Sequence, residues 1–183
     1  ITGLETAIIL IAFVIVASVL AYVVLSAGLF SSQKAKESVH SGLQETRSTI
    51  ELKGNVLGKM ENSVLTEVYF TVGTPASSDS IDFTPTANST NLVIISYSDA
   101  YQVIPTVNWS MAKLNTSTAD NMLDNNELFQ ITVDLSVVSA SVPDEQKPGP
   151  YHTFQLEVKP PVGAILAIER TIPARVDQIV NLY

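Results

Sequence analysis

The chain has 183 residues, of which 46% are hydrophobic and only 15% are charged, and its formal net charge is −8. This charged fraction is below the roughly 25% of ordinary soluble domains, which indicates that part of the chain is built for apolar surroundings. The lack of cysteine excludes disulfides, thiolate metal sites and cysteine catalysis, and 2 histidines are too few for a His-rich metal cluster. The 10 Lys and Arg residues are scattered and outnumbered by 18 Asp and Glu, which argues against nucleic acid as a partner.

The first predicted element is an apolar helix near the N-terminus. Residues 6–33 carry no charge, and the 24 residues from Ala7 to Phe30 are apolar on every face. As a helix this run is about 36 Å long, enough to span the hydrocarbon core of a bilayer. It must therefore lie in lipid or among other apolar helices. It lacks the basic region and short apolar core of a secretory signal peptide, and the start at Ile1 instead of Met predicts that a leader has already been removed.

An amphipathic pattern continues the helix beyond this apolar run. Apolar positions recur at intervals of four and three, as in a heptad seam, with charged residues between them. The seam comprises Val39, Leu43, Thr46, Ile50, Lys53, Leu57, Met60 and Val64, of which two are polar. Because no proline occurs before Pro75, the sequence predicts one helical rod from near Thr2 to about Glu61, roughly 90 Å long.

Glycines inside the predicted rod need an explanation, because each costs about 1 kcal/mol of helix propensity relative to alanine. They mark kinks, or they let neighbouring helices approach closely, as Gly54 and Gly58 four residues apart would allow. The residues expected to pack in a bundle of such helices are Glu5, Gly28, Leu43, Ile50, Gly54, Leu57 and Gly58.

From Val64 the hydrophobic period changes to two, which predicts a strand that ends near Val72. Further strands are expected over 91–98, 101–107, 128–138, 151–158, 164–171 and 176–182, with a short helix only within 115–126. Since no amphipathic helix separates these strands, they favour an antiparallel sandwich over a parallel sheet. The predicted fold class is α+β: a helical rod, residues 1–62, followed by an immunoglobulin-like antiparallel β-sandwich, residues 63–183.

The sequence contains no recognisable catalytic or cofactor-binding motif. A glycine-rich phosphate loop, a GxSxG elbow, an HExxH pair and EF-hand spacing are all missing. We therefore expect no enzymatic activity, no cofactor and no metal. The carboxylates and amides from Asp120 to Glu127 form the one candidate calcium site, but a solvated loop is the simpler interpretation without the EF-hand register. His152 lies in a strand pattern and is expected to be structural.

Three Asn-X-Ser/Thr sequons begin at Asn88, Asn108 and Asn115, and none has proline in the middle. They lie in the part of the chain that carries the whole net charge, since residues 62–183 hold 13 acidic and 5 basic residues. An acidic surface of this kind is typically solvated, and exposed loops are expected there. The three asparagines are therefore predicted to carry N-linked glycans.

Motifs near both ends of the chain carry a family resemblance. They are Gly3–Ala7, Ser26–Phe30, Gln33–Lys34, Lys159–Gly163, Glu169–Thr171, Pro173 and Asn181–Tyr183. The segments that contain these motifs, about 40 residues at the N-terminus and residues 159–183, resemble the mature N-terminus and the closing strands of archaellins, the archaeal flagellins, and together they cover over a third of the chain. Residues 75–149 carry no motif that we recognise, as expected for a variable outer surface. Glu5 departs from the family pattern, because many archaellins have glycine there and a glutamate is more like type IV pilins.

The resemblance implies a leader removed by a prepilin-type peptidase, transient membrane insertion of the helix, and an extracellular helical filament, the archaellum, that a separate motor turns for motility. Neighbouring helices would remove the cost of taking an apolar segment from lipid into water. Head-to-tail contacts that do not close a ring give an open helical homopolymer. Two other hypotheses stay open: an archaeal type IV adhesion pilin, and a membrane-anchored surface protein.

Glu5 is the only charged side chain before Lys34. An ionised carboxylate among apolar helices is strongly unfavourable unless it is paired. The amine of Ile1 is the nearest partner, and pairing within the first turn also suits the helix dipole. The amine of an adjacent subunit is the alternative, and that pair would help to set the axial register between helices.

Overall fold

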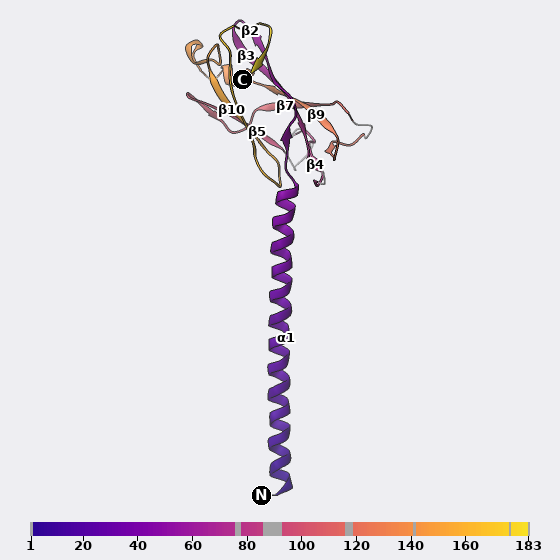
Figure 1. The fold of residues 1–183 in the computed structure, drawn as a ribbon. Helices are drawn as coiled ribbons and strands as arrows, with labels where there is room; N and C mark the ends of the chain where they lie inside the picture. The colour runs from indigo at the N-terminus through magenta and orange to yellow at the C-terminus, as the bar shows by residue number, and fades with distance from the viewer. Residues whose placement is uncertain are drawn as a thin grey trace. The chain divides into compact units, whose positions relative to one another are not determined.

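The computed structural model describes residues 2–75, 78–85, 93–115, 119–140, 142–175 and 177–182. The chain divides into two compact units, Ile1–Leu43 and Gln44–Tyr183, which are described separately below (Figure 1). The first unit contains most of one long helix, and the second contains the described strands. The predicted α+β fold, with a long N-terminal helix before antiparallel strands, is confirmed.

Helix α1 (Gly3–Arg47) includes the entire apolar run and the first part of the amphipathic stretch. Its start and type agree with the prediction, but the predicted continuation to Glu61 is wrong. The last turn closes where the Ser48 N–H donates to Gln44 O at 2.9 Å. Directly after this turn Ser48 and Ile50 are buried in the second unit, so the helix ends where the chain enters that unit.

The segment predicted as the end of the rod forms two strands, β1 (Glu51–Leu52) and β2 (Val56–Glu61). Gly54 lies in the turn between them with φ of +87°, a conformation that side chains disfavour. Gly58 lies within β2, where an added Cβ would sit 2.6 Å from Leu65 Cδ1. The two glycines are thus required by a turn and by sheet packing, and their spacing of four does not mark a helix contact.

The second unit is built from antiparallel strands in two larger sheets. The first sheet has the order β12 (Ile179–Leu182), β2, β3 (Val64–Gly73), β9 (Leu128–Asp134) and β7 (Asn108–Lys113), with β1 paired to β3. The second has the order β11 (Leu166–Thr171), β10 (Thr153–Lys159), β5 (Ile94–Asp99) and β6 (Val103–Ile104). Two short strands, β4 (Ile81–Asp82) and β8 (Met122–Leu123), form a separate pair.

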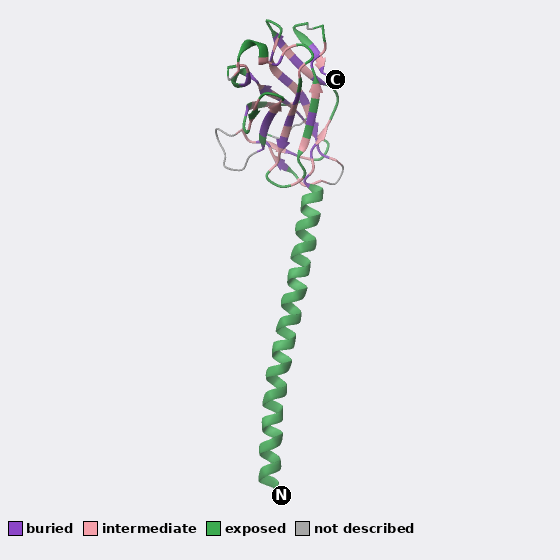
Figure 2. Ribbon diagram, turned by 90° about the vertical axis from the view of Figure 1, so that its left-hand side faces the viewer, coloured by how far each residue is buried: buried purple, intermediate pink, exposed green. Residues whose placement is uncertain are grey.

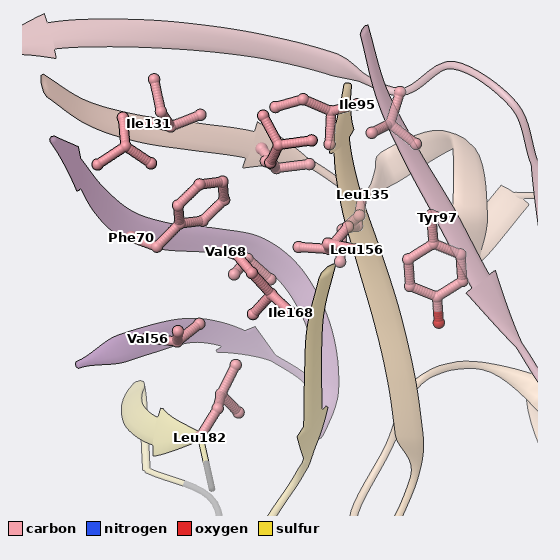
Figure 3. Packing of buried hydrophobic residues seen from close by; sticks show 14 of the residues in the cluster. Val56, Val68, Phe70, Ile95, Tyr97, Ile131, Leu135, Leu156, Ile168 and Leu182 are labelled. Carbon is pink, nitrogen blue, oxygen red and sulfur yellow. The ribbon is translucent and has the colours of Figure 1, made fainter. Parts of the chain in front are cut away.

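One hydrophobic core lies between the two larger sheets, and side chains from both point into it (Figure 3). In the first sheet Phe70 pairs with Ile131, and in the second Leu156 pairs with Tyr97. All four are at most 1% exposed. Alternate burial along β9 and β10 shows why the period-two pattern predicted these strands.

Three local predictions in this unit need correction. The predicted strand over 128–138 ends at Asp134, whose carboxylate accepts the Ser136 N–H at 2.8 Å and begins the short helix α2 (Ser136–Ala140). The short helix expected within 115–126 is absent from residues 119–126, which hold β8 instead. The strand expected over 101–107 reduces to β6, and β7 begins beyond it. A 3₁₀ turn, Asp144–Gln146, precedes β10.

Candidate functional site

Helix α1 has a long exposed apolar surface, because none of its residues is buried (Figure 2). Phe13, for example, is 70% exposed, and the other large side chains of the apolar run are similarly open. By length and composition α1 also suffices to cross a membrane. A water-exposed apolar surface of this extent is unfavourable, so the helix needs lipid or protein around it.

The Glu5 carboxylate accepts a hydrogen bond within the first turn of α1. Glu5 Oε2 accepts the Thr2 backbone N–H at 3.3 Å, and the Glu5 N–H donates to Thr2 O at 3.1 Å. A carboxylate at this place also interacts favourably with the helix dipole. The pairing expected with the amine of Ile1 lies outside the described residues.

Three of the residues predicted to pack between helices, Glu5, Gly28 and Leu43, lie exposed on α1. An added Cβ at Gly28 would meet nothing within 4 Å, and Leu43 is 58% exposed. Their contacts with neighbouring helices remain predictions. Between Gly28 and Leu43 the helix becomes polar, with an exposed ion pair of 2.6 Å between Lys34 and Glu37.

The other predicted packing residues belong to the β-rich unit. Ile50 is buried in its core, Leu57 lies in β2 opposite Tyr69, and Gly54 and Gly58 have the sheet roles described above. Their assignment to a helix bundle is wrong. The heptad spacing led to the wrong element here. In β2 every second residue, Val56, Gly58 and Met60, lies on the buried face, but glycine has no apolar side chain to mark position 58 as buried.

The last turn of α1 lies within the second unit and is held there by several contacts. Arg47 forms a 3.3 Å ion pair with Asp79, and the Asp79 N–H donates to Arg47 O at 3.3 Å. Ser48 is buried against Gly163, whose φ is +109° and where an added Cβ would lie 1.5 Å from Ser48 O. No side chain is therefore possible at position 163 without moving the backbone.

Two of the three sequon asparagines, Asn108 and Asn115, are among the described residues, and both are exposed. Asn108 begins the edge strand β7, with Trp109 turned partly into the core. Asn115 follows β7, and its side-chain amide donates weakly to Asn126 O at 3.5 Å. Asn88 lies outside the described residues. The exposure of the two asparagines agrees with the requirement of a glycan for open space, and occupancy remains a prediction.

The structure brings together a buried polar cluster around Asp99 that the sequence did not reveal. Its carboxylate accepts hydrogen bonds from Tyr97 Oη at 2.7 Å and from the backbone N–H groups of Tyr101 and Gln102 at 2.7 and 2.9 Å. His152 Nε2 lies 3.1 Å from it. Burial acts to raise the pKa of Asp99, but these hydrogen bonds outweigh burial and lower the pKa below its usual value. Burial, together with Asp99, raises the pKa of the Tyr97 hydroxyl.

This cluster lies beside an open hollow of about 840 Å³, lined by polar loops between β2 and β3 and before β10. Tyr101, Tyr151 and His152 are part of the lining, together with the carboxylates of Asp144 and Glu145. The Asp99 carboxylate is occupied by its contacts with Tyr97, His152 and the backbone of the loop that follows it. These contacts are those of a structural polar cluster, and the structural role of His152 stays a prediction.

The carboxylate cluster from Asp120 to Glu127 does not converge on one point. Asp124 Oδ1 accepts a hydrogen bond from Ser80, and Glu127 Oε2 accepts the Asp124 N–H at 3.2 Å. In the described part of the chain, no group of three His, Cys, Asp or Glu side chains is placed to hold a metal ion.

The exposed apolar helix and the separate, well-packed antiparallel unit define a subunit of a larger assembly. Comparison with known proteins gives that assembly an identity. The family model for archaeal-type flagellin matches residues 1–170. The chain belongs to the archaeal-type flagellin family.

Individual relatives agree with this assignment. The probable flagellin 1 of Archaeoglobus fulgidus is 37% identical, over 99% of this chain and 93% of that protein. The probable flagellin 1 of Aeropyrum pernix is 29% identical, over 95% of this chain and 92% of that protein.

Two solved structures are similar as well. The archaeal flagellum of Methanospirillum hungatei matches with a TM-score of 0.75 at 28% identity, over 100% of this chain and 99% of that chain. An archaeal flagellin from Methanocaldococcus jannaschii matches with a TM-score of 0.58 at 10% identity, over 73% and 95% of the two chains, and supports the fold. The chain is thus a structural subunit of the archaellum, an extracellular filament at the cell surface. Its family gives no indication of an enzyme.

Proposed function

We propose that the chain forms the filament as a homopolymer, with copies of α1 bundled in the core and the β-rich unit facing water. The observation that carries this proposal is the contrast between α1, which buries none of its apolar residues, and the second unit, whose core is complete. Burying one large aliphatic side chain is worth about 1.5–3 kcal/mol, so covering the many exposed ones on α1 is a strong drive for association.

Before assembly, the same surface requires lipid. The apolar run matches the thickness of a bilayer core, so the subunit is held in the membrane by α1 until neighbouring helices replace the lipid. Transfer between two apolar environments avoids exposure to water at every stage. Because all copies have the same surface, their contacts generate an open helical polymer when the rotation between subunits does not close.

The acidic unit is proposed to carry N-linked glycans at Asn88, Asn108 and Asn115 on the outside of the filament. Exposure of Asn108 and Asn115 supports this, as does their location on an edge strand and the segment after it. Intact mass of the purified filament protein tests the proposal. Asparagine-to-glutamine substitution at each site assigns the added mass, and a mass equal to that of the unmodified chain contradicts it.

Glu5 is proposed to act within its own subunit, through the first turn of α1. Its contacts with Thr2 and the dipole support this role. The substitution Glu5→Gln keeps the shape and removes the charge, so filaments of normal length and abundance are expected. Loss of assembly with normal export and leader cleavage would favour a charge pair with the adjacent subunit instead.

A matched pair of substitutions tests the burial of α1. Val19 on the helix and Val103 on β6 are both exposed in the single chain, 58% and 73%. An aspartate at position 19 would be buried without a partner in the proposed core, whereas one at position 103 would stay in water. We expect Val19→Asp to abolish filaments and Val103→Asp to leave them intact, as seen by electron microscopy of sheared cell-surface material. Normal filaments from Val19→Asp would refute the proposal.

A further inference from the structure

The apolar run of α1 contains three side chains with hydroxyl groups: Ser18, Tyr22 and Ser26. Every other side chain from Ala7 to Phe30 is hydrocarbon or belongs to glycine. The three are spaced by four residues, so they lie along one side of the helix. In a water-free helix bundle each hydroxyl needs a hydrogen-bond partner, because an unpaired buried hydroxyl is costly.

A serine on a helix finds its partner within its own backbone. Ser18 Oγ donates to Ile15 O at 2.8 Å, one turn earlier in α1. This bond uses the only proton of the Ser18 hydroxyl and leaves its lone pairs free to accept. Ser18 therefore presents an oriented acceptor on the helix surface.

The Tyr22 hydroxyl cannot donate to the backbone of its own helix in this way. Its hydroxyl lies at the far end of a ring that projects from the helix, and the side chain is 75% exposed. Tyr22 Oη has no hydrogen-bond partner among the described residues. The residue also lies about 12 Å along the helix from Phe30, well inside the apolar run and away from the ends where tyrosines meet the membrane surface.

We propose that Tyr22 Oη donates a hydrogen bond to Ser18 Oγ of an adjacent copy of α1 in the filament. This inference rests on the proposed burial of α1 in the core. Subunits related by one helical symmetry point in the same direction along the filament, so neighbouring helices are parallel. A shift of four residues, about 6 Å, then brings Tyr22 of one copy level with Ser18 of the next. Ala17 and Ala21 beside them are small enough for close approach.

The bond would distinguish the filament from the membrane-inserted subunit. In lipid a lone α1 offers Tyr22 no acceptor, whereas an adjacent helix at the correct axial shift does. The pair therefore favours assembly and also selects one stagger between helices that are otherwise apolar and able to slide. An apolar contact alone carries no such directional requirement.

The test is Tyr22→Phe in the full chain, which removes only the hydroxyl. We expect filaments to form, to dissociate into subunits at a lower temperature, and to leave a membrane-retained fraction larger by roughly three- to tenfold, the effect of one neutral hydrogen bond. Ser18→Ala should produce the same loss, and the double variant should lose little more than either single one. Ser26→Ala, a serine on the same side of the helix, and Tyr101→Phe, on the exposed surface of the β-rich unit, are the matched controls and should behave as the unaltered chain.

Two outcomes would overturn the inference: Tyr22→Phe filaments that dissociate as the unaltered ones do, or losses from Tyr22→Phe and Ser18→Ala that simply add. A high-resolution filament map provides the direct measurement, in which Tyr22 Oη should lie within about 3 Å of Ser18 Oγ of a neighbour. Failure of the proposed function is recognised separately, because it would show as normal filaments from Val19→Asp.

Discussion

The two units of the chain use the same residue types in opposite ways. Valine and phenylalanine are exposed along α1, whereas in the β-rich unit Val68 and Phe70 are at most 1% exposed. The β-rich unit completes its core within one chain, so its stability is a property of the subunit. The helix completes its packing only with other molecules, so its stability is a property of the assembly. The contribution of a residue to stability must therefore be measured on the subunit if it lies in the β-rich unit, and on the assembly if it lies in α1.

The largest expected effect comes from truncating the same residue type in the two units. Phe70→Ala should destabilise the β-rich unit by about 3–5 kcal/mol, because it removes a fully buried ring and leaves a cavity. Phe13→Ala should leave the unfolding of that unit unchanged. Thermal unfolding of the detergent-solubilised full chain, followed by near-UV circular dichroism, makes the comparison. Equal destabilisation by both substitutions would show that the units do not differ in the way described.

Asp99→Asn tests the buried polar cluster. Because the folded-state pKa of Asp99 lies below its unfolded value, the ionised form contributes stability above the unfolded pKa, and this is lost as pH falls through the folded pKa. At pH 7 we expect a loss of about 2–3 kcal/mol, since an amide cannot replace a carboxylate that accepts several hydrogen bonds. Denaturant unfolding at pH 7 and below about pH 4 checks this, and the difference from the unaltered chain should shrink at the lower pH.

Two glycine-to-alanine substitutions, one in each unit, should change stability by smaller amounts. Gly58→Ala places a methyl group 2.6 Å from the end of the flexible Leu65 side chain, which must move, and should cost about 1–2 kcal/mol in the β-rich unit. Gly42→Ala meets nothing within 4 Å and should stabilise α1 by about 1 kcal/mol. Denaturant unfolding measures the first, and helix content in detergent the second. A stabilising Gly58→Ala would contradict the packing described for β2.

The smallest effect is expected from the exposed ion pair on α1. Both Lys34 and Glu37 are largely open to water, so the attraction between their charges is screened. Lys34→Ala should change the helix content of the subunit in detergent by an amount that corresponds to less than about 0.5 kcal/mol. A markedly larger loss would show that this pair stabilises more than its exposure allows.

The sequence was most informative where a hydrophobic period was long. The apolar run predicted α1, and alternation predicted β3, β9 and β10, because each pattern repeats several times. The end of the helix was misjudged because heptad spacing continued by coincidence through β2, where Gly58 occupies a buried position. Propensity alone would not have placed that boundary at Arg47.

The Asp99 cluster was beyond sequence analysis for a different reason. Asp99 and His152 are separated by 53 positions along the chain and meet only because β5 and β10 pair in the second sheet. No local spacing marks such a pair. The sequons, in contrast, are local motifs, and two of their three asparagines could be located directly on exposed backbone.

The position of β12 determines when the β-rich unit can fold. This strand, the last along the chain that the structure describes, pairs with β2, which follows α1 almost directly. Leu182 covers the space left by Gly58, so the core beside β2 stays open until β12 has been synthesised. During synthesis, α1 appears first and the strand that closes the sheet appears last. Under the proposed insertion of α1 in lipid, the helix is already surrounded by an apolar environment while the strands that complete the core are still being synthesised.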